Sequence, residues 1–240
     1  MRHWIDLNCD MGEIPEAIAD GTQESLMPYL TSVNIACGGH AGDEQTIRTT
    51  IEQALHWKLA LGAHPAYADR SNFGRTELNL EPEALAEMVF EQVQGFARVA
   101  DEFGAHVAHV KAHGALYNQA VHNRAIAGAI AKGVARWSKD VVLIGLAGSP
   151  MLDVFREVGF AVAAEAFADR RYEPDGTLRS RKFADALILD PQEAGLQALR
   201  FAEQGTAQTI CIHGDTPGAP KIAGAVAGAL RKAGVELRSL

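Results

Sequence analysis

The chain has 240 residues, of which 48% are hydrophobic and 22% charged, and its formal net charge is −8. This composition is typical of a globular protein. The acidic balance argues against a nucleic-acid or anionic-membrane partner, because phosphate binding normally needs a basic face. No apolar stretch has the length of a signal peptide or a membrane span, and the three cysteines stand singly without CxxC spacing. These features favour reduced thiols in a cytoplasmic protein.

Apolar runs alternate with amphipathic segments along the chain. The runs predict strands, and the segments with apolar residues three or four positions apart predict helices. Proline at the start and glycine at the end mark the limits of several helices. Residues 66–80 and 173–183 are polar and aperiodic, and the state of 186–189 stays open. We expect strands at residues 4–10, 32–37, 59–63, 106–110, 141–144, 160–164 and 209–212, and the main helices at 43–57, 82–103, 126–137, 150–158, 190–204 and 217–233.

Strands that are almost continuously apolar, and that alternate with helices, predict a parallel sheet covered by helices. About seven strand–helix units fit into this length, which favours a closed or nearly closed barrel over an open sheet. The GxGxxG and GxxxxGK[ST] spacings of nucleotide-binding loops are both absent from the sequence. We therefore predict an α/β fold, an irregular seven-stranded (β/α) barrel that forms a single domain over residues 1–240.

Polar side chains follow the predicted strands, where a (β/α) barrel carries its active site. Four of the nine histidines lie just past a strand end, next to glycine or proline. Any one of these residues could be a polar cap of the barrel rim, but their convergence predicts an active site. Five other histidines lie within predicted elements and are taken as structural: His3, His56, His106, His109 and His122. The strand-end residues are Asp10, Glu13, His40, Asp43, His64, Lys111, His113, Glu165, Asp169, His213 and Asp215.

The segment after the second strand is rich in glycine. Gly38, Gly39 and Gly42 would let backbone N–H groups approach a ligand, and a helix that begins near Asp43 would point its positive end at an anion. A tight turn without a ligand explains the same residues equally well. We interpret the segment as a possible anion cradle.

Metal binding is left open by the sequence. Six strand-end residues have suitable ligand atoms, yet no HxxxH or similar local pair fixes a geometry. Lys111, Arg75 and Arg170 could clamp a substrate or phosphate, or could form ion pairs and solvated surface. The six possible ligands are Asp10, His40, His64, His113, His213 and Asp215, of which Asp10, His64, His113 and Asp215 are the preferred candidates.

Six ordered motifs resemble those of the LamB/YcsF family. They lie at residues 6–13, 34–43, 62–65 with 73–75, 110–118, 165–172 and 213–215. The resemblance implies a barrel related to glycoside hydrolases and NodB-like deacetylases. It also implies ATP-dependent opening of 5-oxo-L-proline to L-glutamate, with Mg²⁺ accompanying the ATP. The partners implied are the B and C subunits of 5-oxoprolinase (PxpB and PxpC).

With this activity in view, roles can be suggested for the strand-end residues. Lys111 and the backbone of residues 38–42 would stabilise phosphate or oxyanion charge. Asp10, His40 and His113 would transfer protons. Glu165, Asp169 and Asp215 would position these groups or carry Mg²⁺ with the phosphates. The expected substrate- and phosphate-binding residues are Asn8, Gly38, Gly39, Asp43, His64, Arg75, Asn118, Glu165, Asp169, Arg170, His213 and Asp215.

Two other functions fit the same residues. A metal-dependent hydrolase or deacetylase acting on an amide or a sugar would use the histidines and carboxylates as ligands. A non-catalytic subunit could instead hold a metabolite for its partners.

Overall fold

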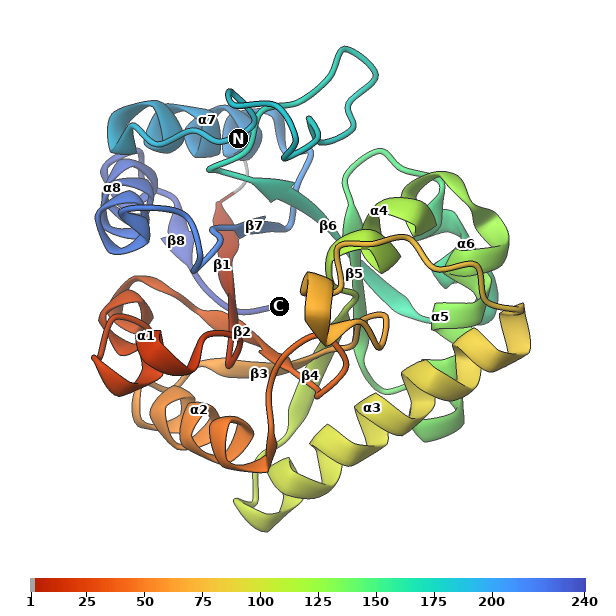
Figure 1. Cartoon of the computed structure of the whole chain (residues 1–240). Coiled ribbons are helices and arrows are strands. Elements are labelled where there is room, and N and C mark those ends of the chain that lie inside the picture. Colours follow the sequence, from red (N-terminus) through yellow and green to blue (C-terminus); the bar gives the residue numbers. More distant parts are fainter. Residues whose placement is uncertain (1–2) are drawn as a thin grey trace.

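The computed structural model describes residues 3–240 and shows a closed barrel of seven parallel strands (Figure 1). The strands pair in the order of the chain from β2 to β7, and β1 closes the barrel because it pairs with both β7 and β2. The predicted seven-stranded (β/α) barrel is therefore confirmed. The strands are β1 (Trp4–Met11), β2 (Ser32–Ala36), β3 (Ala60–His64), β4 (Val107–Lys111), β5 (Val142–Leu146), β6 (Ala161–Phe167) and β7 (Thr209–Cys211).

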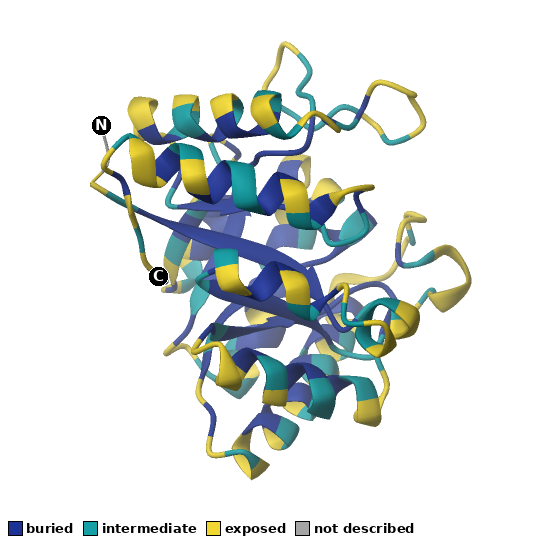
Figure 2. Ribbon diagram, turned by 90° about the vertical axis from the view of Figure 1, so that its left-hand side faces the viewer, coloured by how far each residue is buried: buried dark blue, intermediate teal, exposed yellow. Residues whose placement is uncertain are grey.

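Helices surround the barrel and bury its outer surface (Figures 1 and 2). Their apolar stripes face the strands, whereas the exposed residues lie on the outer faces of the helices (Figure 2). The helices are α1 (Pro15–Ala19), η1 (Glu24–Tyr29), α2 (Glu44–His56), η2 (Arg70–Asn72), α3 (Pro82–Glu102), α4 (Gly114–His122), α5 (Arg124–Trp137), α6 (Met151–Val158), α7 (Pro191–Gln204) and α8 (Ala219–Lys232). Within residues 3–240, no helix is both long and apolar enough to cross a membrane.

Two local features differ from the expectations, and a third, the state of residues 186–189, had been left open. Residues 114–122 form a further helix, α4, which is separated from α5 because the Asn123 side chain caps the backbone N–H groups that begin α5. A short strand, β8 (Glu236–Leu237), pairs with the start of β1. Residues 186–189 are irregular, with one antiparallel bridge from Leu187 to Arg170.

The inside of the barrel is unusually polar for this fold, in which branched apolar side chains normally fill the interior. Asp6, Asn8 and Asp10 alternate along β1 and are buried on one face of the strand. Asn8 donates a hydrogen bond to Glu165 on β6, although β7 lies between the two strands, so both side chains point inward. The barrel therefore leads from a polar interior to the strand ends that carry the site.

Candidate active site

A cavity of about 520 Å³ opens at the carboxyl ends of the strands. Its wall combines residues at the ends of β1, β3, β4, β5 and β6 with residues of α4 and of the loops that follow β1, β3, β4, β6 and β7. Predicted site residues that line it are Asp10, His64, Arg75, Lys111, His113, Asn118, Arg170, His213 and Asp215; Glu13, Tyr117, His122, Arg181 and Lys182 line it as well.

Lys111 places a buried positive charge in the cavity wall. Its Nζ lies 3.0 Å from Oδ1 of Asp10, 2.9 Å from Oε1 of Glu165 and 3.1 Å from Sγ of Cys211. Burial alone would lower the pKa of Lys111, but the neighbouring acidic groups raise it well above its usual value. Burial would likewise raise the pKa of Asp10, but His64 and Lys111 hold it well below its usual range. The ammonium and the carboxylate therefore stay charged at neutral pH.

A hydrogen-bond chain beneath the cavity fixes the Asp10 carboxylate. Asn34 donates to Oδ1 of Asp10 at 2.8 Å and to Oδ1 of Asn8 at 2.7 Å, and His109 lies 2.7 Å from the Asn34 amide oxygen. Burial lowers the pKa of His109 to about 3, so this imidazole is neutral. Gly62 makes room for it, because a Cβ at residue 62 would lie 2.0 Å from Nε2 of His109. His109, which the sequence suggested was structural, thus positions Asp10.

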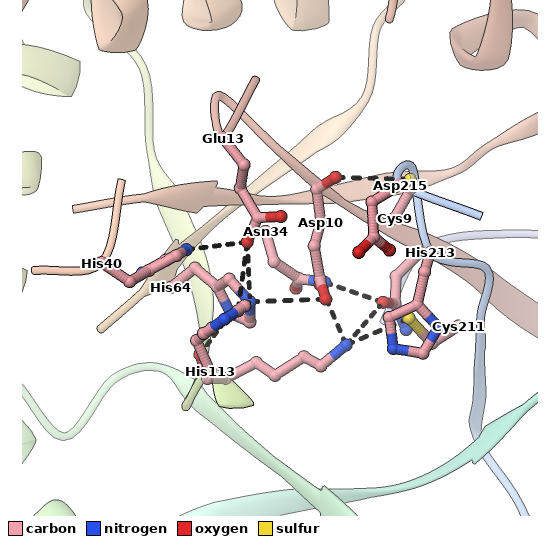
Figure 3. Close-up of polar contacts among 12 residues, drawn as sticks. Cys9, Asp10, Glu13, Asn34, His40, His64, His113, Cys211, His213 and Asp215 are labelled. Carbon is pink, nitrogen blue, oxygen red and sulfur yellow. Dashed lines mark hydrogen bonds and ion pairs between the residues drawn. The ribbon is translucent and has the colours of Figure 1, made fainter. Parts of the chain in front are cut away.

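Glu13 and three histidines converge on one side of the cavity (Figure 3). Oε1 of Glu13 lies 2.7 Å from Nε2 of His40, 3.1 Å from Nδ1 of His113 and 3.7 Å from Nε2 of His64. The rings of His40 and His113 stack with centroids 3.7 Å apart. Burial lowers the pKa of His40 to about 4. The four side chains could hold one metal ion, since their ligand atoms all lie within 4.8 Å of one another.

His213 lines the same cavity, and the buried Asp169 holds it from behind. Nδ1 of His213 lies 2.9 Å from Oδ1 of Asp169, and the backbone N–H of His213 and the hydroxyl of Thr216 donate to Oδ2. The imidazole also stacks on the Phe167 ring at 5.2 Å. Burial would raise the pKa of Asp169, but its contacts with His213 and Thr216 hold it below the usual value. The Asp169 carboxylate can only accept, so Nδ1 of His213 donates this hydrogen bond and Nε2 is the ring nitrogen that remains to exchange a proton.

Arginines line the mouth of the cavity. Arg75 and Arg181 contact Asp215 at 2.5 and 2.8 Å. Arg170 is 6% exposed; one of its Nη atoms donates to the carbonyl of Arg179, and its Nε has no partner among residues 3–240. Burial, followed by the charge of Arg181, lowers the pKa of Arg170 to about 10, so the side chain stays charged at neutral pH. A buried guanidinium that is only partly satisfied favours an anionic ligand.

The structure does not bring every predicted residue to the cavity. Gly38, Gly39 and Asp43 lie outside its lining, and Arg70 donates to the backbone carbonyls of Gly38 and Gly42. A Cβ at Gly39 would lie 2.5 Å from the Gln92 side chain, so this glycine allows close packing. Asp43 caps α2. Four other predicted residues are buried behind those that line the cavity: Asn8, His40, Glu165 and Asp169.

Three residues that line the cavity were given no role from the sequence. Glu13 follows β1, and its place after a strand end made it a candidate site residue, but the sequence suggested no role for it. Tyr117 belongs to the 110–118 motif, and Arg181 lies in the polar segment 173–183. Neither stands at a strand end, so only the folded chain shows that they reach the cavity.

The closed barrel, with acid, histidine and lysine side chains at its strand ends, defines a (β/α)-barrel enzyme equipped for acid–base chemistry. The model of the LamB/YcsF family matches residues 5–240, and the chain belongs to this family.

Named relatives agree with this assignment. The A subunit of 5-oxoprolinase from Chloroflexus aggregans is 44% identical over 247 residues, which cover 98% of this chain and 98% of that protein. The crystal structure of a lactam utilization protein from Thermus thermophilus matches with a TM-score of 0.91 and 36% identity, over 99% of this chain and 100% of that one. The catalytic domain of a peptidoglycan N-acetylglucosamine deacetylase from Eubacterium rectale matches 100% of this chain and 89% of its own, with a TM-score of 0.55 and 8% identity. That likeness shows a shared fold alone.

Proposed function

We propose that this chain opens the lactam ring of 5-oxo-L-proline to give L-glutamate, as the A subunit of an ATP-dependent 5-oxoprolinase. The relatives named above support the substrate class. The observation that carries the proposal is the cavity itself, in which the buried Lys111 cation and His213 line one space of about 520 Å³, with Asp169 behind the imidazole as its hydrogen-bond partner. A five-membered lactam with a carboxylate fits within such a volume.

The role of ATP follows from the chemistry of the amide. The lactam is resonance-stabilised, and the glutamate product can close again to form it. If the lactam oxygen attacks the γ-phosphorus and ADP leaves, the amide becomes an O-phosphorylated imidate, whose ring carbon is activated toward attack by water. One water adds to this carbon, and the carbon–nitrogen bond breaks as the nitrogen takes a proton, which leaves an acyl phosphate. A second water attacks the acyl carbon and releases phosphate, so each turnover consumes one lactam, one ATP and two waters.

His213 is the residue best placed to move protons in this sequence. Because Nδ1 donates to Asp169, Nε2 can accept a proton from the attacking water and later deliver one to the leaving nitrogen. His40 and His113, which the sequence suggested as proton carriers, are less suited to this role. The ring nitrogens of His113 already face Glu13, His64 and the carbonyl of Phe73, and His40 does not line the cavity.

Lys111 would stabilise negative charge that develops on the lactam oxygen. The side chain is held in place before substrate arrives, by Asp10 on one side and Glu165 on the other. A fixed cation in a water-poor site needs little reorganisation as charge develops. Asp10 and Glu165 would therefore act as positioning residues for Lys111.

The mouth of the cavity suits an anion, either the substrate carboxylate or the ATP phosphates. Arg170 offers a buried and partly unsatisfied guanidinium, and Arg181 and Lys182 lie near it on the same wall. Mg²⁺ would enter with the phosphates. Asp215 is a poor ligand for it, because Arg75 and Arg181 already neutralise this carboxylate. We place the reaction in the cytoplasm, in a complex with the B and C subunits.

The test is a glutamate-release assay with the three purified subunits, 5-oxo-L-proline and MgATP. We expect glutamate only when this chain and ATP are both present. Release at the full rate by the B and C subunits alone would overturn the proposal, as would release that does not require ATP.

A further inference from the structure

The cluster of Glu13, His40, His64 and His113 has no part in the proton transfers proposed above, and its arrangement calls for a positive charge. Two of its imidazoles have their protons fixed by the backbone. Nδ1 of His64 lies 2.7 Å from the carbonyl oxygen of Lys111, and Nε2 of His113 lies 3.0 Å from that of Phe73. Because a carbonyl can only accept, each of these nitrogens carries the ring proton.

When both rings are neutral, their opposite nitrogens therefore present lone pairs, whereas a proton on Nε2 of His64 would face Oδ2 of Asp10 at 3.4 Å. Nε2 of His64 and Nδ1 of His113 lie 3.0 Å apart, and Oε1 of Glu13 lies 3.7 and 3.1 Å from them. Three acceptors thus face one another in a buried place, where all three side chains are at most 7% exposed. Such a group is stable only with a cation, either a shared proton or a metal ion, at its centre.

We infer that Glu13, His40, His64 and His113 bind one divalent transition-metal ion of the zinc class. Tetrahedral coordination with bonds of about 2.0–2.1 Å requires ligand atoms about 3.3 Å apart. Four of the six distances among these atoms lie between 2.7 and 3.7 Å and bracket this value, and all six are within 4.8 Å. The His40 and His113 rings lie 6° from parallel, so one of them would turn for both lone pairs to point at the ion. Imidazole that donates its distal N–H to a backbone carbonyl is the usual outer-shell arrangement of a metal-binding histidine.

The ligand types select the class of metal. Three imidazole nitrogens and one carboxylate oxygen suit Zn²⁺, Co²⁺ or Ni²⁺, whereas Mg²⁺ and Ca²⁺ prefer oxygen ligands. The inferred set keeps His64 and His113 from the sequence-based candidates and replaces the other two. Asp10 is already bound to Lys111, and Asp215 to two arginines.

A neighbouring group of possible metal ligands differs from the Glu13 cluster, because a lysine side chain already supplies it with a positive charge. Asp10, Cys211 and His213 also lie within reach of a single ion. However, the Lys111 ammonium lies 3.0 Å from Asp10 and 3.1 Å from the Cys211 sulfur, so this group already has its cation. No lysine or arginine contacts the Glu13 cluster in the same way among residues 3–240. The inference does not depend on the lactam reaction, and the chain alone can test it.

The experiment uses the full chain without a histidine tag, stripped of metal by a chelator and then titrated with Co²⁺ and with Zn²⁺. We expect one equivalent of each to bind by calorimetry, visible d–d absorption from Co²⁺ in a nitrogen–oxygen site, and a higher Tm in the presence of Zn²⁺. Glu13→Gln and His113→Gln should weaken binding by at least about 100-fold, because each removes a ligand rather than an outer-shell contact. Far-UV circular dichroism checks that each variant is folded.

His122→Ala is the matched control, because His122 lines the same cavity but lies outside the cluster and is exposed. It should bind the metal as the unaltered chain does. Absence of stoichiometric binding by the unaltered chain would overturn the inference and assign a shared proton to the cluster. Equal affinity in folded Glu13→Gln and in His122→Ala would overturn it too. Either result leaves the proposed lactam opening untouched, since that activity is read from glutamate release.

Discussion

Nζ of Lys111 lies 2.9 Å from Oε1 of Glu165 inside the barrel, and Nδ2 of Asn8 holds the same oxygen at 3.0 Å. This ion pair differs from one on the surface, because neither side chain is more than 3% exposed. Water therefore does not screen the pair, and removing one partner leaves the other charge buried. The Lys111 ammonium in the cavity wall is therefore held and stabilised by Glu165, although Glu165 does not itself line the cavity.

The first prediction concerns this pair. Lys111→Met should lower the free energy of unfolding by about 3–5 kcal/mol, since Asp10 and Glu165 lose their counter-charge in a buried site. Lys111→Met combined with Glu165→Gln should recover part of that loss. Denaturant unfolding of the four proteins in the double-mutant cycle gives the coupling energy. Strictly additive effects would mean that the two charges do not interact as the structure indicates.

The second prediction tests the pairing of His213 with Asp169. Asp169→Asn should reduce kcat of the reconstituted complex by about 10²–10⁴-fold with little change in KM, because an amide does not hold the imidazole in the required tautomer. Thr216→Val is the comparison, since it removes one hydrogen bond to the same carboxylate and leaves the His213 contact. Equal rates for Asp169→Asn and the unaltered chain would exclude His213 as the proton carrier.

The third prediction concerns Arg170. Arg170→Met should raise KM for 5-oxo-L-proline or for ATP by about 10–100-fold, the amount expected when a charged hydrogen bond worth about 1.5–3 kcal/mol is lost. The free energy of unfolding should not fall, because the substitution removes a buried charge that is only partly satisfied. Steady-state kinetics with each substrate varied in turn tells the two anions apart. Unchanged KM values for both substrates would show that Arg170 binds neither.

The fourth prediction is a pH dependence of stability that originates at Asp6. Burial raises the pKa of Asp6 to about 6, although Thr209, Thr31 and Ser32 donate hydrogen bonds to its carboxylate. The folded chain thus holds this proton more tightly than the unfolded chain. The resulting stability is complete below about pH 4 and is lost as the pH rises through about 6.

The variant Asp6→Asn isolates this effect, because asparagine stays neutral. The free energy of unfolding of the unaltered chain, relative to that of this variant, should fall by at most ~3 kcal/mol between pH 4 and pH 7. This limit follows because the pKa of Asp6 is about two units higher in the folded chain than in the unfolded chain. Denaturant unfolding of both proteins at several pH values measures it. Parallel stability curves across that range would show that Asp6 does not titrate as stated.

Local patterns were sufficient to predict the barrel. The run that became β5 is almost wholly apolar, because helices cover one face of the sheet and the barrel interior lies on the other. A short stretch of sequence is enough to reveal such a run. Helix α4 was not predicted, because its first residues belong to the strand-end motif 110–118 and only the Asn123 cap separates it from α5. Strand β8 is too short to leave a periodic signal.

The site was predicted less completely, because its geometry depends on which strand ends meet. His64 and His113 could be named from their position after β3 and β4, which are neighbours in the barrel. Nothing local indicated that His109 would reach Asn34 across the interior, or that Asp215 would be held by Arg181 from the polar loop. The glycines at 38 and 39 fit an anion cradle as well as a packed turn, and only the contacts of Arg70 and Gln92 distinguish the two.

The most direct test of the central claim measures glutamate and ADP together in the reconstituted complex, with either the unaltered chain or His213→Asn. We predict equal amounts of glutamate and ADP with the unaltered chain, and a rate of glutamate formation at least about 100-fold lower with the variant. His106→Ala should keep the unaltered rate, because His106 is exposed and does not line the cavity. Glutamate formation at an undiminished rate with folded His213→Asn would contradict the claim that the lactam is opened at this cavity.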